Sequence, residues 1–387
     1  MDIKEIDNKY IASTYARYPV TLLCGKGSLA YDDKGNEYID MGSGIGVDSF
    51  GYSDPVWLSA VVEQASTLQH VSNLYYTEPG AKLAALLCKK AGMKKAFFCN
   101  SGAEANECVI KAARKYAAEK KGPEYSTIIT LRNGFHGRTL TTLAATGQEH
   151  YHELYNPLTP GFVYADAEDI HGVMRLAEEN KTAAILFECI QGEGGVIPLS
   201  MSFVQDLAAF GAREDILIAV DEVQTGNGRT GALYSYMNYG ISPDLVSTAK
   251  GLAGGLPIGA CLFGEKTQDV FQPGDNGSTF GANPVCCAAA LSVLGRMDDA
   301  FLALVREKGD YAKNAFTGAS GIKSVTGMGL MIGLETEKPA AEVVNKCLEK
   351  GVLCLTAKNR VRLLPALNIP MEVLEKAVGI IKAVCAE

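Results

Sequence analysis

Two residues near the middle of the chain have the types and the spacing to act together in chemistry. An apolar run over 216–220 predicts a strand buried on both faces, and Asp221 follows it directly. A second predicted strand, over 244–248, is followed closely by Lys250. Because open α/β sheets bind ligands where their strands end, we expect this carboxylate and this amine to lie at one rim of one sheet.

This pair suits the chemistry of pyridoxal phosphate (PLP). The aldehyde of PLP forms a Schiff base with a lysine, and its pyridine nitrogen must stay protonated to draw electrons. Lys250 and Asp221 match these two needs. Taken singly, the aspartate is as easily a strand-end cap and the lysine a solvated loop residue. The prediction therefore depends on a phosphate site and carboxylate-binding arginines elsewhere in the chain.

A phosphate site is indicated where a predicted strand over 96–99 leads into a predicted helix over 103–119. Ser101 could cap this helix, and Gly102 would let a ligand approach the backbone closely. The free N–H groups of the first turn, which includes Ala103, favour an anion. A plain helix cap has the same pattern, so this prediction gains its weight from Lys250.

Aromatic and basic groups follow a third predicted strand, over 126–131. The ring of Phe135 or His136 could lie flat on a cofactor ring, and Arg138 could hold a carboxylate through two parallel hydrogen bonds. Glu193 lies in a glycine-rich segment after a further strand. Segments far apart in the sequence thus bring polar groups to one rim, and their agreement favours a shared active site over separate structural roles.

A glycine pattern also raises the possibility of nicotinamide chemistry. Gly226, Gly228 and Gly231 match the spacing of the dinucleotide-binding fingerprint and follow a strand. The aromatic segment after them is soon broken by Gly240, and the next acid, Asp244, comes too early for a contact with the ribose. An NAD-dependent oxidoreductase is therefore disfavoured.

Composition limits the partners and the compartment. A net charge of −8 argues against nucleic acid or an anionic membrane as the main partner. The 11 cysteines show no C-x-x-C or metal-ligand spacing, so we expect no metal, and an odd number fits a reducing cytoplasm. The N-terminus lacks the pattern of a signal peptide, and no apolar run reaches membrane-spanning length. We expect a cytoplasmic protein.

The order of predicted elements favours an α/β fold. Strands and helices alternate between residues 96 and 263, which is typical of a mostly parallel sheet with both faces covered. An Ala-rich helix over 283–297 leads out of this part, and the remainder reads as a smaller α+β domain. The length of 387 residues also suggests two domains. We expect an N-terminal segment over 1–48 that packs with the small domain, a large PLP-binding domain over 49–298 and a small domain over 299–387.

Motifs along nearly the whole chain, taken in order, resemble those of the class III, fold-type I PLP-dependent aminotransferases. The motifs that carry this resemblance lie at 101–105, 135–138, 191–195, 221–226, 249–250 and 277–281. Within the family, the chain is most similar to the acetylornithine aminotransferases. That narrower similarity is carried by residues 14–20, 72–76, 329–333 and 361–365.

The resemblance implies roles for the residues around the cofactor. Lys250 would hold PLP as a Schiff base and move the proton, Asp221 would pair with the pyridinium nitrogen, and Gln224 would contact the phenolic oxygen. Phe135 would stack on the ring, with His136 beside it in the cofactor site. Three residues at the start of the predicted helix would cradle the phosphate, namely Ser101, Gly102 and Ala103.

For the substrates, the resemblance implies one pocket that takes both the amino donor and 2-oxoglutarate. Arg138 would bind the carboxylate far from the reacting amine, and Tyr15 would line the pocket. Glu193 and Arg362 would form an ion pair that opens when a second substrate carboxylate arrives.

The resemblance also implies a homodimer with shared active sites. Thr279 would reach the phosphate of the partner subunit, and its neighbour Ser278 would lie on the substrate side.

The expected reaction is transfer of the terminal (ω) amino group of N2-acetylornithine to 2-oxoglutarate. It gives N-acetylglutamate 5-semialdehyde and glutamate, as in arginine biosynthesis. The alternatives within this chemistry are ornithine, succinylornithine and 4-aminobutyrate aminotransferases. A non-catalytic PLP- or dicarboxylate-binding protein is a remote alternative, since a binding module need not retain Lys250, Asp221 and Arg138.

Overall fold

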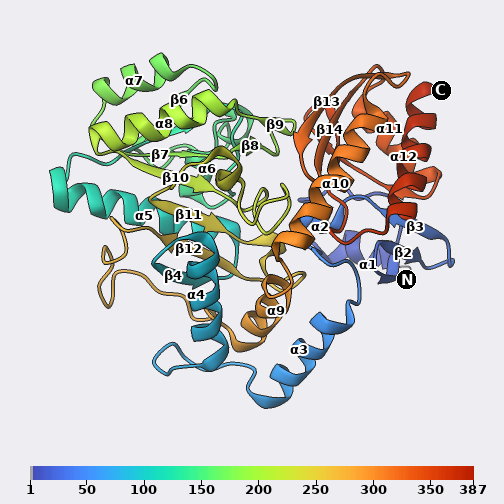
Figure 1. Cartoon of the computed structure of the whole chain (residues 1–387), viewed down its shortest axis with the longest axis horizontal. Helices are drawn as coiled ribbons and strands as arrows, with labels where there is room; N and C mark the ends of the chain where they lie inside the picture. Colours follow the sequence, from blue (N-terminus) through green and yellow to red (C-terminus); the bar gives the residue numbers. More distant parts are fainter. Residues whose placement is uncertain (1–2) are drawn as a thin grey trace.

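The computed structural model describes residues 3–387, which form two lobes lying side by side (Figure 1). The larger lobe is built on a seven-stranded sheet with the order β4-β12-β11-β10-β7-β5-β6. Its strands are β4 (Lys95–Cys99), β5 (Thr127–Leu131), β6 (Phe162–Ala165), β7 (Thr182–Phe187), β10 (Leu217–Asp221), β11 (Leu245–Thr248) and β12 (Gly259–Phe263). Strand β12 runs antiparallel to both of its neighbours, and β5, β6, β7, β10 and β11 pair in parallel.

Alternation along β10 explains why this sheet has helices on both faces. Leu217 and Ala219 pack in one cluster with α5 (Gly102–Lys121), whereas Ile218 and Val220 pack in another with residues of α8 (Met201–Glu214). Successive side chains on a strand point to opposite faces, so a continuous apolar run requires cover on both sides. The other helices of this lobe are α3 (Pro55–Thr67), α4 (Glu78–Ala91), α6 (Leu140–Ala145), α7 (Ile170–Glu179) and α9 (Pro284–Leu294).

Several expected elements shift by one to three residues in the structure, including the strands expected over 96–99, 126–131 and 244–248. The strand expected over 216–220 lies one residue later, so Asp221 is its last residue. The helix expected over 103–119 extends over Gly102–Lys121. The helix expected over 283–297 already ends at Leu294, with Gly295 as its cap residue.

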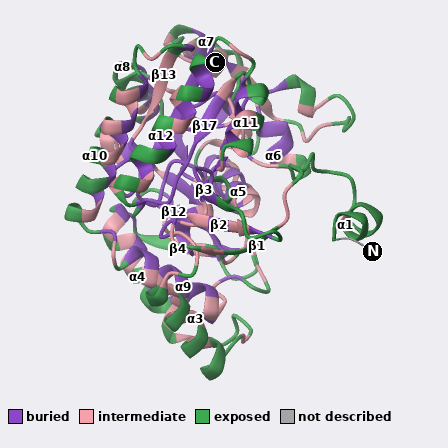
Figure 2. Cartoon of the chain, turned by 90° about the vertical axis from the view of Figure 1, so that its right-hand side faces the viewer, coloured by how far each residue is buried: buried purple, intermediate pink, exposed green. Residues whose placement is uncertain are grey.

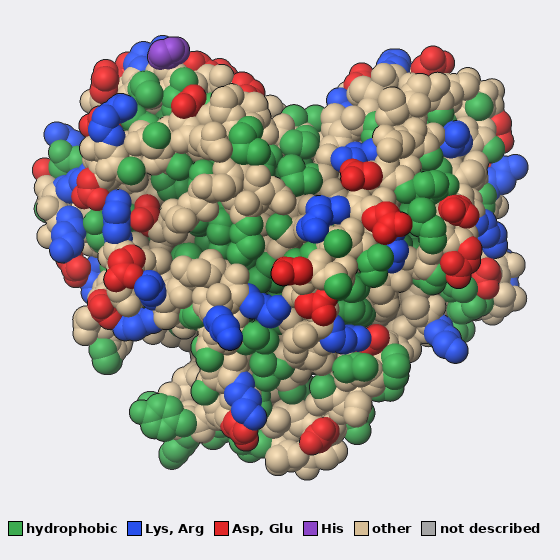
Figure 3. Space-filling model, viewed as in Figure 1, with side chains coloured by type: hydrophobic (Ala, Val, Ile, Leu, Met, Phe, Trp, Pro, Cys, Tyr) green, Lys and Arg blue, Asp and Glu red, His purple; other side chains and the backbone are tan. Residues whose placement is uncertain are grey.

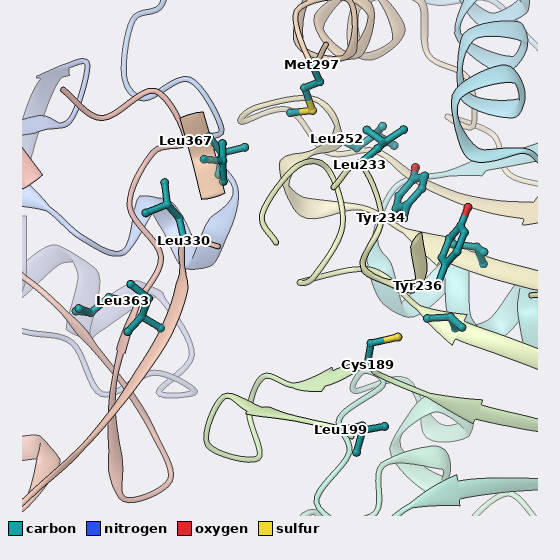
Figure 4. Packing of buried hydrophobic residues seen from close by; sticks show 14 of the residues in the cluster. Cys189, Leu199, Leu233, Tyr234, Tyr236, Leu252, Met297, Leu330, Leu363 and Leu367 are labelled. Carbon is teal, nitrogen blue, oxygen red and sulfur yellow. The ribbon is translucent and has the colours of Figure 1, made fainter. Parts of the chain in front are cut away.

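The smaller lobe carries an antiparallel sheet with the order β13-β14-β17-β16. Its strands are β13 (Ile322–Met328), β14 (Met331–Thr336), β16 (Leu355–Ala357) and β17 (Arg360–Leu363), and its helices are α10 (Asp299–Phe316), α11 (Ala340–Glu349) and α12 (Met371–Ala386). Buried side chains from both lobes form one hydrophobic cluster, in which Leu330, Leu363 and Leu367 face Met297, Leu252 and Leu233 (Figure 4).

The N-terminal part of the chain joins the C-terminal part through a second small sheet. Its strands are β1 (Leu22–Lys26), β2 (Leu29–Asp32), β3 (Glu37–Asp40) and β15 (Val352–Leu353). Ile39 of β3 pairs in parallel with Val352 of β15, so the first strands lie beside the C-terminal helix α12 (Figure 1). Helix α1 (Ile3–Tyr10) has no buried residue and stands away from the body of the molecule (Figure 2).

A left-handed turn, α2 (Ser43–Gly46), follows β3 and was not expected. All four of its residues have positive φ, including the β-branched Ile45 at 66°. Such a conformation costs on the order of 1–3 kcal/mol for a residue other than glycine, so its surroundings must hold it in place. Asp40 contributes to this, because its Oδ1 accepts hydrogen bonds from the N–H groups of Gly42 and Ser43 at 2.7 and 2.9 Å.

The glycine pattern that suggested a dinucleotide site instead forms a turn between the lobes. Gly228 and Gly231 have φ of 86° and 81°, and they carry Arg229, which is only 2% exposed, into the smaller lobe. The Arg229 guanidinium donates hydrogen bonds to the carbonyl oxygens of Leu330 and Pro365. These glycines therefore let one buried arginine join the two lobes.

The remaining elements are short. They are β8 (Ile190–Gln191), β9 (Ile197–Pro198), η1 (Glu149–Tyr151), η2 (Ser235–Tyr239) and η3 (Lys250–Leu252). Among residues 3–387, no helix combines the length and apolar character needed to cross a membrane. Over the same residues, no group of three or more His, Cys, Asp or Glu side chains is arranged to hold a metal ion.

Candidate active site

The predicted segments meet around one cavity of about 390 Å³ at the C-terminal ends of the parallel strands. That volume lies within the range of small-molecule binding sites. Eight of the predicted residues line the cavity, namely Ser101, Gly102, Ala103, Phe135, His136, Asp221, Gln224 and Lys250. The structure therefore brings together residues from four segments that are far apart in the sequence.

Asp221 is the most firmly positioned of these residues. It ends β10 and is 3% exposed. Its Oδ2 accepts a hydrogen bond from Asn106 Nδ2 at 2.7 Å and lies 2.8 Å from Nδ1 of His136. Its Oδ1 accepts a hydrogen bond from the Val223 N–H at 3.0 Å. Partners on both oxygens fix the orientation of this buried carboxylate.

Two side chains hold Asp221: His136, which the sequence analysis named, and Asn106, which it missed. The His136 ring orients Asp221 because its Nδ1 contacts the carboxylate. The side chain is fully buried, so the ring exposes no face to solvent. Asn106 also donates a hydrogen bond to the His136 carbonyl oxygen at 2.8 Å. Asn106 lies four residues after Gly102, one turn along the same face of α5, and that spacing could have identified it.

Lys250 is held in a strained backbone conformation just after β11. Its φ is 41°, and Asn227 Nδ2 donates a hydrogen bond to the carbonyl oxygen of the preceding Ala249 at 2.9 Å. Within residues 3–387, the Lys250 amine forms no hydrogen bond or ion pair. Burial lowers the pKa of the Lys250 amine, against the opposing effect of Glu193. A larger share of the amine is therefore neutral and nucleophilic.

Glu188 is a second buried acid of the cavity wall, at the end of β7. Its two carboxylate oxygens accept hydrogen bonds from the N–H groups of Phe135 and Gly192 at 3.0 and 3.1 Å. Burial, together with the nearby charge of Asp221, raises the pKa of Glu188 to about 7. Glu188 therefore joins the loop that carries Phe135 to the glycine-rich loop, a role the sequence analysis did not assign.

The start of α5 presents free backbone N–H groups to the cavity. Ser101 Oγ caps the helix by accepting a hydrogen bond from the Glu104 N–H at 3.2 Å. A Cβ atom at Gly102 would lie 2.6 Å from Cγ1 of Val223, so glycine is required at this close approach. The N–H groups of Gly102 and Ala103 have no partner within a helix of this geometry, which makes the turn suited to a phosphate.

Beside the cavity, the buried Arg362 forms an ion pair with the partly buried Glu193. Arg362 Nη1 lies 2.5 Å from Glu193 Oε1 and donates a second hydrogen bond to Gln224 Oε1 at 3.1 Å. Although burial alone would raise it, the pKa of the Glu193 carboxyl is lowered by the Arg362 guanidinium. Gln224 lines the cavity, so it connects the ion pair to the site.

Arg138 differs from Arg362 because no acid pairs with it among residues 3–387. Its guanidinium carbon lies 5.2 Å from the centre of the Phe135 ring and 5.8 Å from that of the Tyr151 ring. The side chain is exposed. An unpaired guanidinium held against aromatic rings can receive a carboxylate.

Like Arg138, Glu193 and Arg362, three more predicted residues lie outside the cavity wall. Tyr15 is 69% exposed and lines a neighbouring cavity of about 430 Å³. The left-handed turn lies between the two cavities, with Ile45 in the wall of one and Val47 in the wall of the other. Ser278 Oγ accepts a hydrogen bond from Asn100 Nδ2 at 3.2 Å, and Thr279 is exposed beside it.

Comparison with known proteins decides the family. The family model described as "Aminotransferase class-III" matches residues 10–385. The chain is a class-III aminotransferase. Its curated relatives include an acetylornithine aminotransferase of Haemophilus ducreyi, 48% identical over 100% of this chain and 98% of that protein. Another, from Aquifex aeolicus, is 44% identical over 97% of this chain and 99% of that protein.

Solved structures of aminotransferases share the fold. The N-acetylornithine aminotransferase of Stenotrophomonas maltophilia K279a matches with a TM-score of 0.86 and 32% identity, over 99% of this chain and 98% of that one. The ornithine aminotransferase of Toxoplasma gondii ME49 matches with a TM-score of 0.94 and 30% identity, over 99% of this chain and 94% of that one. These matches confirm the predicted α/β, fold-type I architecture.

This aminotransferase is PLP-dependent, and its cavity fits the cofactor. A buried carboxylate, Asp221, is fixed at the wall where a protonated ring nitrogen needs a negative partner. The free N–H groups at the start of α5 suit the phosphate, and the unpaired amine of Lys250 suits the aldehyde. The donor set of the site therefore matches the chemistry of PLP.

Proposed function

We propose that this aminotransferase moves the terminal amino group of N2-acetylornithine to 2-oxoglutarate, giving N-acetylglutamate 5-semialdehyde and glutamate in arginine biosynthesis. The names of relatives that are 41–48% identical over nearly the whole chain support this choice. The observation that carries it is the contrast between two arginines: among residues 3–387, Arg138 has no acid partner, whereas Arg362 is paired with Glu193. We place the enzyme in the cytoplasm, in keeping with its eleven free thiols.

The cofactor would be held by the residues that line the cavity. When bound, PLP supplies an aldehyde that accepts the amino group and a ring that draws electrons from the reacting carbon. Asp221 would face the ring nitrogen, with His136 and Asn106 fixing its orientation. Gln224 would contact the phenolic oxygen, and Phe135 would lie on the ring. The phosphate would be bound by three residues, Ser101, Gly102 and Ala103.

Lys250 would have two roles in the reaction. Its Nζ would hold the aldehyde carbon of the cofactor and, with a donor bound, would move the proton of the carbon that bears the amine. Burial favours the neutral amine that both roles need. Leu256, Pro257 and Ile258, which line the same cavity, would limit access of water to Nζ.

The two arginines explain how one pocket would accept unlike substrates. N2-acetylornithine has one carboxylate, remote from its reacting amine, and Arg138 would bind it. Glutamate and 2-oxoglutarate have two carboxylates, so Arg362 must also be available. While N2-acetylornithine reacts, the Glu193 carboxylate would keep Arg362 from standing as a bare cation beside the incoming amine. Gly192, with its neighbours in the glycine-rich loop, would let Glu193 withdraw.

Glu193→Ala is expected to affect the two half-reactions unequally. Without the carboxylate, Arg362 repels an ammonium group, so the reaction with N2-acetylornithine should slow by about tenfold or more. The reaction with glutamate should be unchanged or faster, because no ion pair must open first. Single-turnover absorbance measurements on each half-reaction provide the test.

A second ion pair offers a matched control for this experiment. Oε2 of Glu335 lies 3.1 Å from Nη2 of Arg360, and Arg360 is two residues before Arg362 on β17. Glu335→Ala should leave the ratio of the two half-reaction rates as it is in the wild type. If Glu193→Ala slowed both half-reactions equally, the Glu193–Arg362 pair would be only a structural contact. The preference for the donor would then have no proposed cause.

We also propose that the enzyme is a homodimer in which Thr279 serves the partner's site. Thr279 is exposed next to a surface patch formed by Leu74, Tyr75, Tyr76 and Phe280, which are 87%, 68%, 106% and 58% exposed. Asn73 Nδ2 joins the two parts of this patch, because it donates hydrogen bonds to the carbonyl oxygens of Ser278 and Gly281. Hydrophobic side chains are exposed at the lower end of the molecule, around the loop between α3 and α4 (Figure 1 and Figure 3). Large apolar patches of this kind favour a subunit contact.

Tyr76→Asp is expected to convert the enzyme to a monomer that loses PLP and activity together. A buried charge in the proposed contact would weaken it strongly, and the phosphate would then lack the hydroxyl of the partner subunit. Analytical ultracentrifugation and PLP absorbance would follow the two losses. Leu304→Asp, an equivalent change on an exposed residue of α10, should leave both unchanged. A monomeric variant with normal PLP affinity would overturn the shared site.

The amino donor itself is tested with a panel of ω-amino compounds and 2-oxoglutarate. Ornithine is the main competitor, because the ornithine aminotransferase of Toxoplasma gondii ME49 shares the fold with a TM-score of 0.94. The proposal requires that kcat/KM be highest for N2-acetylornithine. A higher value for ornithine, succinylornithine or 4-aminobutyrate would replace the proposed donor and leave the reaction class in place.

A further inference from the structure

Aromatic rings, and not acids, hold the side chain of Arg138. Its guanidinium lies over Phe135 and Tyr151 at 5.2 and 5.8 Å from the ring centres, both within the range of a cation–π contact. The two rings also contact each other edge to face, with centres 5.6 Å apart. The proposed function uses Phe135 for the cofactor and gives Tyr151 no role.

Tyr151 is fixed to the same backbone that carries Arg138. Its own N–H donates a hydrogen bond to the Gln148 carbonyl oxygen at 3.1 Å, and Gln148 Nε2 donates one to the Gly134 carbonyl oxygen at 3.1 Å. On the other side, His152 Nε2 lies 2.9 Å from the Leu143 carbonyl oxygen in α6, just after Arg138. The segment η1 and the arginine loop are therefore tied together on both sides of the ring.

We propose that Tyr151 is a positioning residue that holds the Arg138 guanidinium ready for the far carboxylate of the substrate; this inference rests on the proposed function. A free arginine side chain loses rotamer entropy worth about 2 kcal/mol when it is ordered. Contact with the Tyr151 ring orders the Arg138 side chain before the substrate binds, so less entropy is lost on binding. It also leaves the N–H groups of the guanidinium free, whereas an acidic partner would occupy them.

The ring of Tyr151, and not its hydroxyl, carries this role. Among residues 3–387, the Tyr151 hydroxyl has no hydrogen-bond partner, and the cation–π contact needs only the aromatic face. Tyr151→Phe should therefore behave as the wild type, and Tyr151→Leu should not. Leucine fills similar space with no aromatic face, so the pair of variants separates the ring from mere bulk.

The test compares donors that differ in one carboxylate. N-acetylputrescine is N2-acetylornithine without its carboxylate, so it reacts with the same amine and cannot use Arg138. For Tyr151→Leu, we expect KM for N2-acetylornithine to rise about tenfold with kcat nearly unchanged. The single-turnover efficiency with N-acetylputrescine should stay at the wild-type value. Tyr151→Phe should match the wild type with both donors.

Three results would overturn the inference. They are an unchanged KM for N2-acetylornithine in Tyr151→Leu, an equal loss with N-acetylputrescine, and a loss in Tyr151→Phe as large as in Tyr151→Leu. If the wild-type enzyme does not use N2-acetylornithine, the proposed donor fails instead. The same comparison is then made with glutamate and 2-aminobutyrate, which differ by the far carboxylate, and the same three results decide.

Discussion

Lys250→Ala is expected to abolish transamination, with turnover falling by roughly 10³-fold or more, since acid–base catalysis alone supplies about 10²–10⁴-fold. The variant loses both the amine that bonds to PLP and the base next to the reacting carbon. It should also lose the pH-sensitive visible absorption of the lysine-bound cofactor. Steady-state assays and absorbance spectra recorded over a pH series measure both effects.

Lys120→Ala is the matched control for this experiment. Lys120 is an exposed lysine in the last turn of α5, the helix whose first turn faces the cavity. Its replacement should leave the spectrum and the turnover unchanged. If Lys250→Ala retained wild-type turnover, the assignment of this lysine would be wrong, whatever the variant's spectrum.

Asp221→Ala is expected to lower turnover by about two orders of magnitude, the effect of losing a charge-assisted hydrogen bond of roughly 1.5–3 kcal/mol to the electron-drawing ring. Without the carboxylate, the ring nitrogen should lose its proton. Donor binding depends on groups at the other end of the substrate, so it should fall much less. Single-turnover rates and donor titrations separate the two quantities.

Asp221→Asn controls for damage to the fold. Alanine leaves His136 and Asn106 without their buried partner, and that alone is destabilising. Asparagine keeps the size and a hydrogen-bonding oxygen but carries no charge, so its melting temperature should stay close to that of the wild type while turnover still falls. Near-normal turnover in Asp221→Asn with PLP bound would refute the role of the charge.

The sequence predicted the parts of the site that depend on strand ends and on local turn chemistry. An apolar run of the right length locates β10, and the end of that strand locates Asp221. Ser101 and Gly102 mark the start of α5 by the ordinary preferences of a helix N-terminus. These signals lie within a few neighbouring residues, so a single sequence contains them. The division of the chain near residues 48 and 298 stays a prediction.

Other parts of the site depend on contacts that a local pattern does not contain. Tyr151 lies on a short 3₁₀ turn 13 residues after Arg138, and only the folded backbone places its ring against the guanidinium. Tyr15 lines a neighbouring cavity whose wall includes Ile45 of the left-handed turn. A β-branched residue rarely adopts positive φ, so the sequence does not indicate that turn. Strand β12 also runs antiparallel in an otherwise alternating stretch, since its short connection from β11 allows no crossover helix.

Because β3 pairs with β15, one edge of the small sheet cannot form until a much later part of the chain has been synthesised. Ile39 leaves the ribosome early, and Val352, its partner in the sheet, is added more than 300 residues later. At roughly 5–20 residues per second, that edge of the sheet waits tens of seconds for its last strand. The Asp40 that follows Ile39 also holds the left-handed turn between the two cavities. The sheet edge behind that turn is therefore completed only after Asp221 and Lys250 have been made.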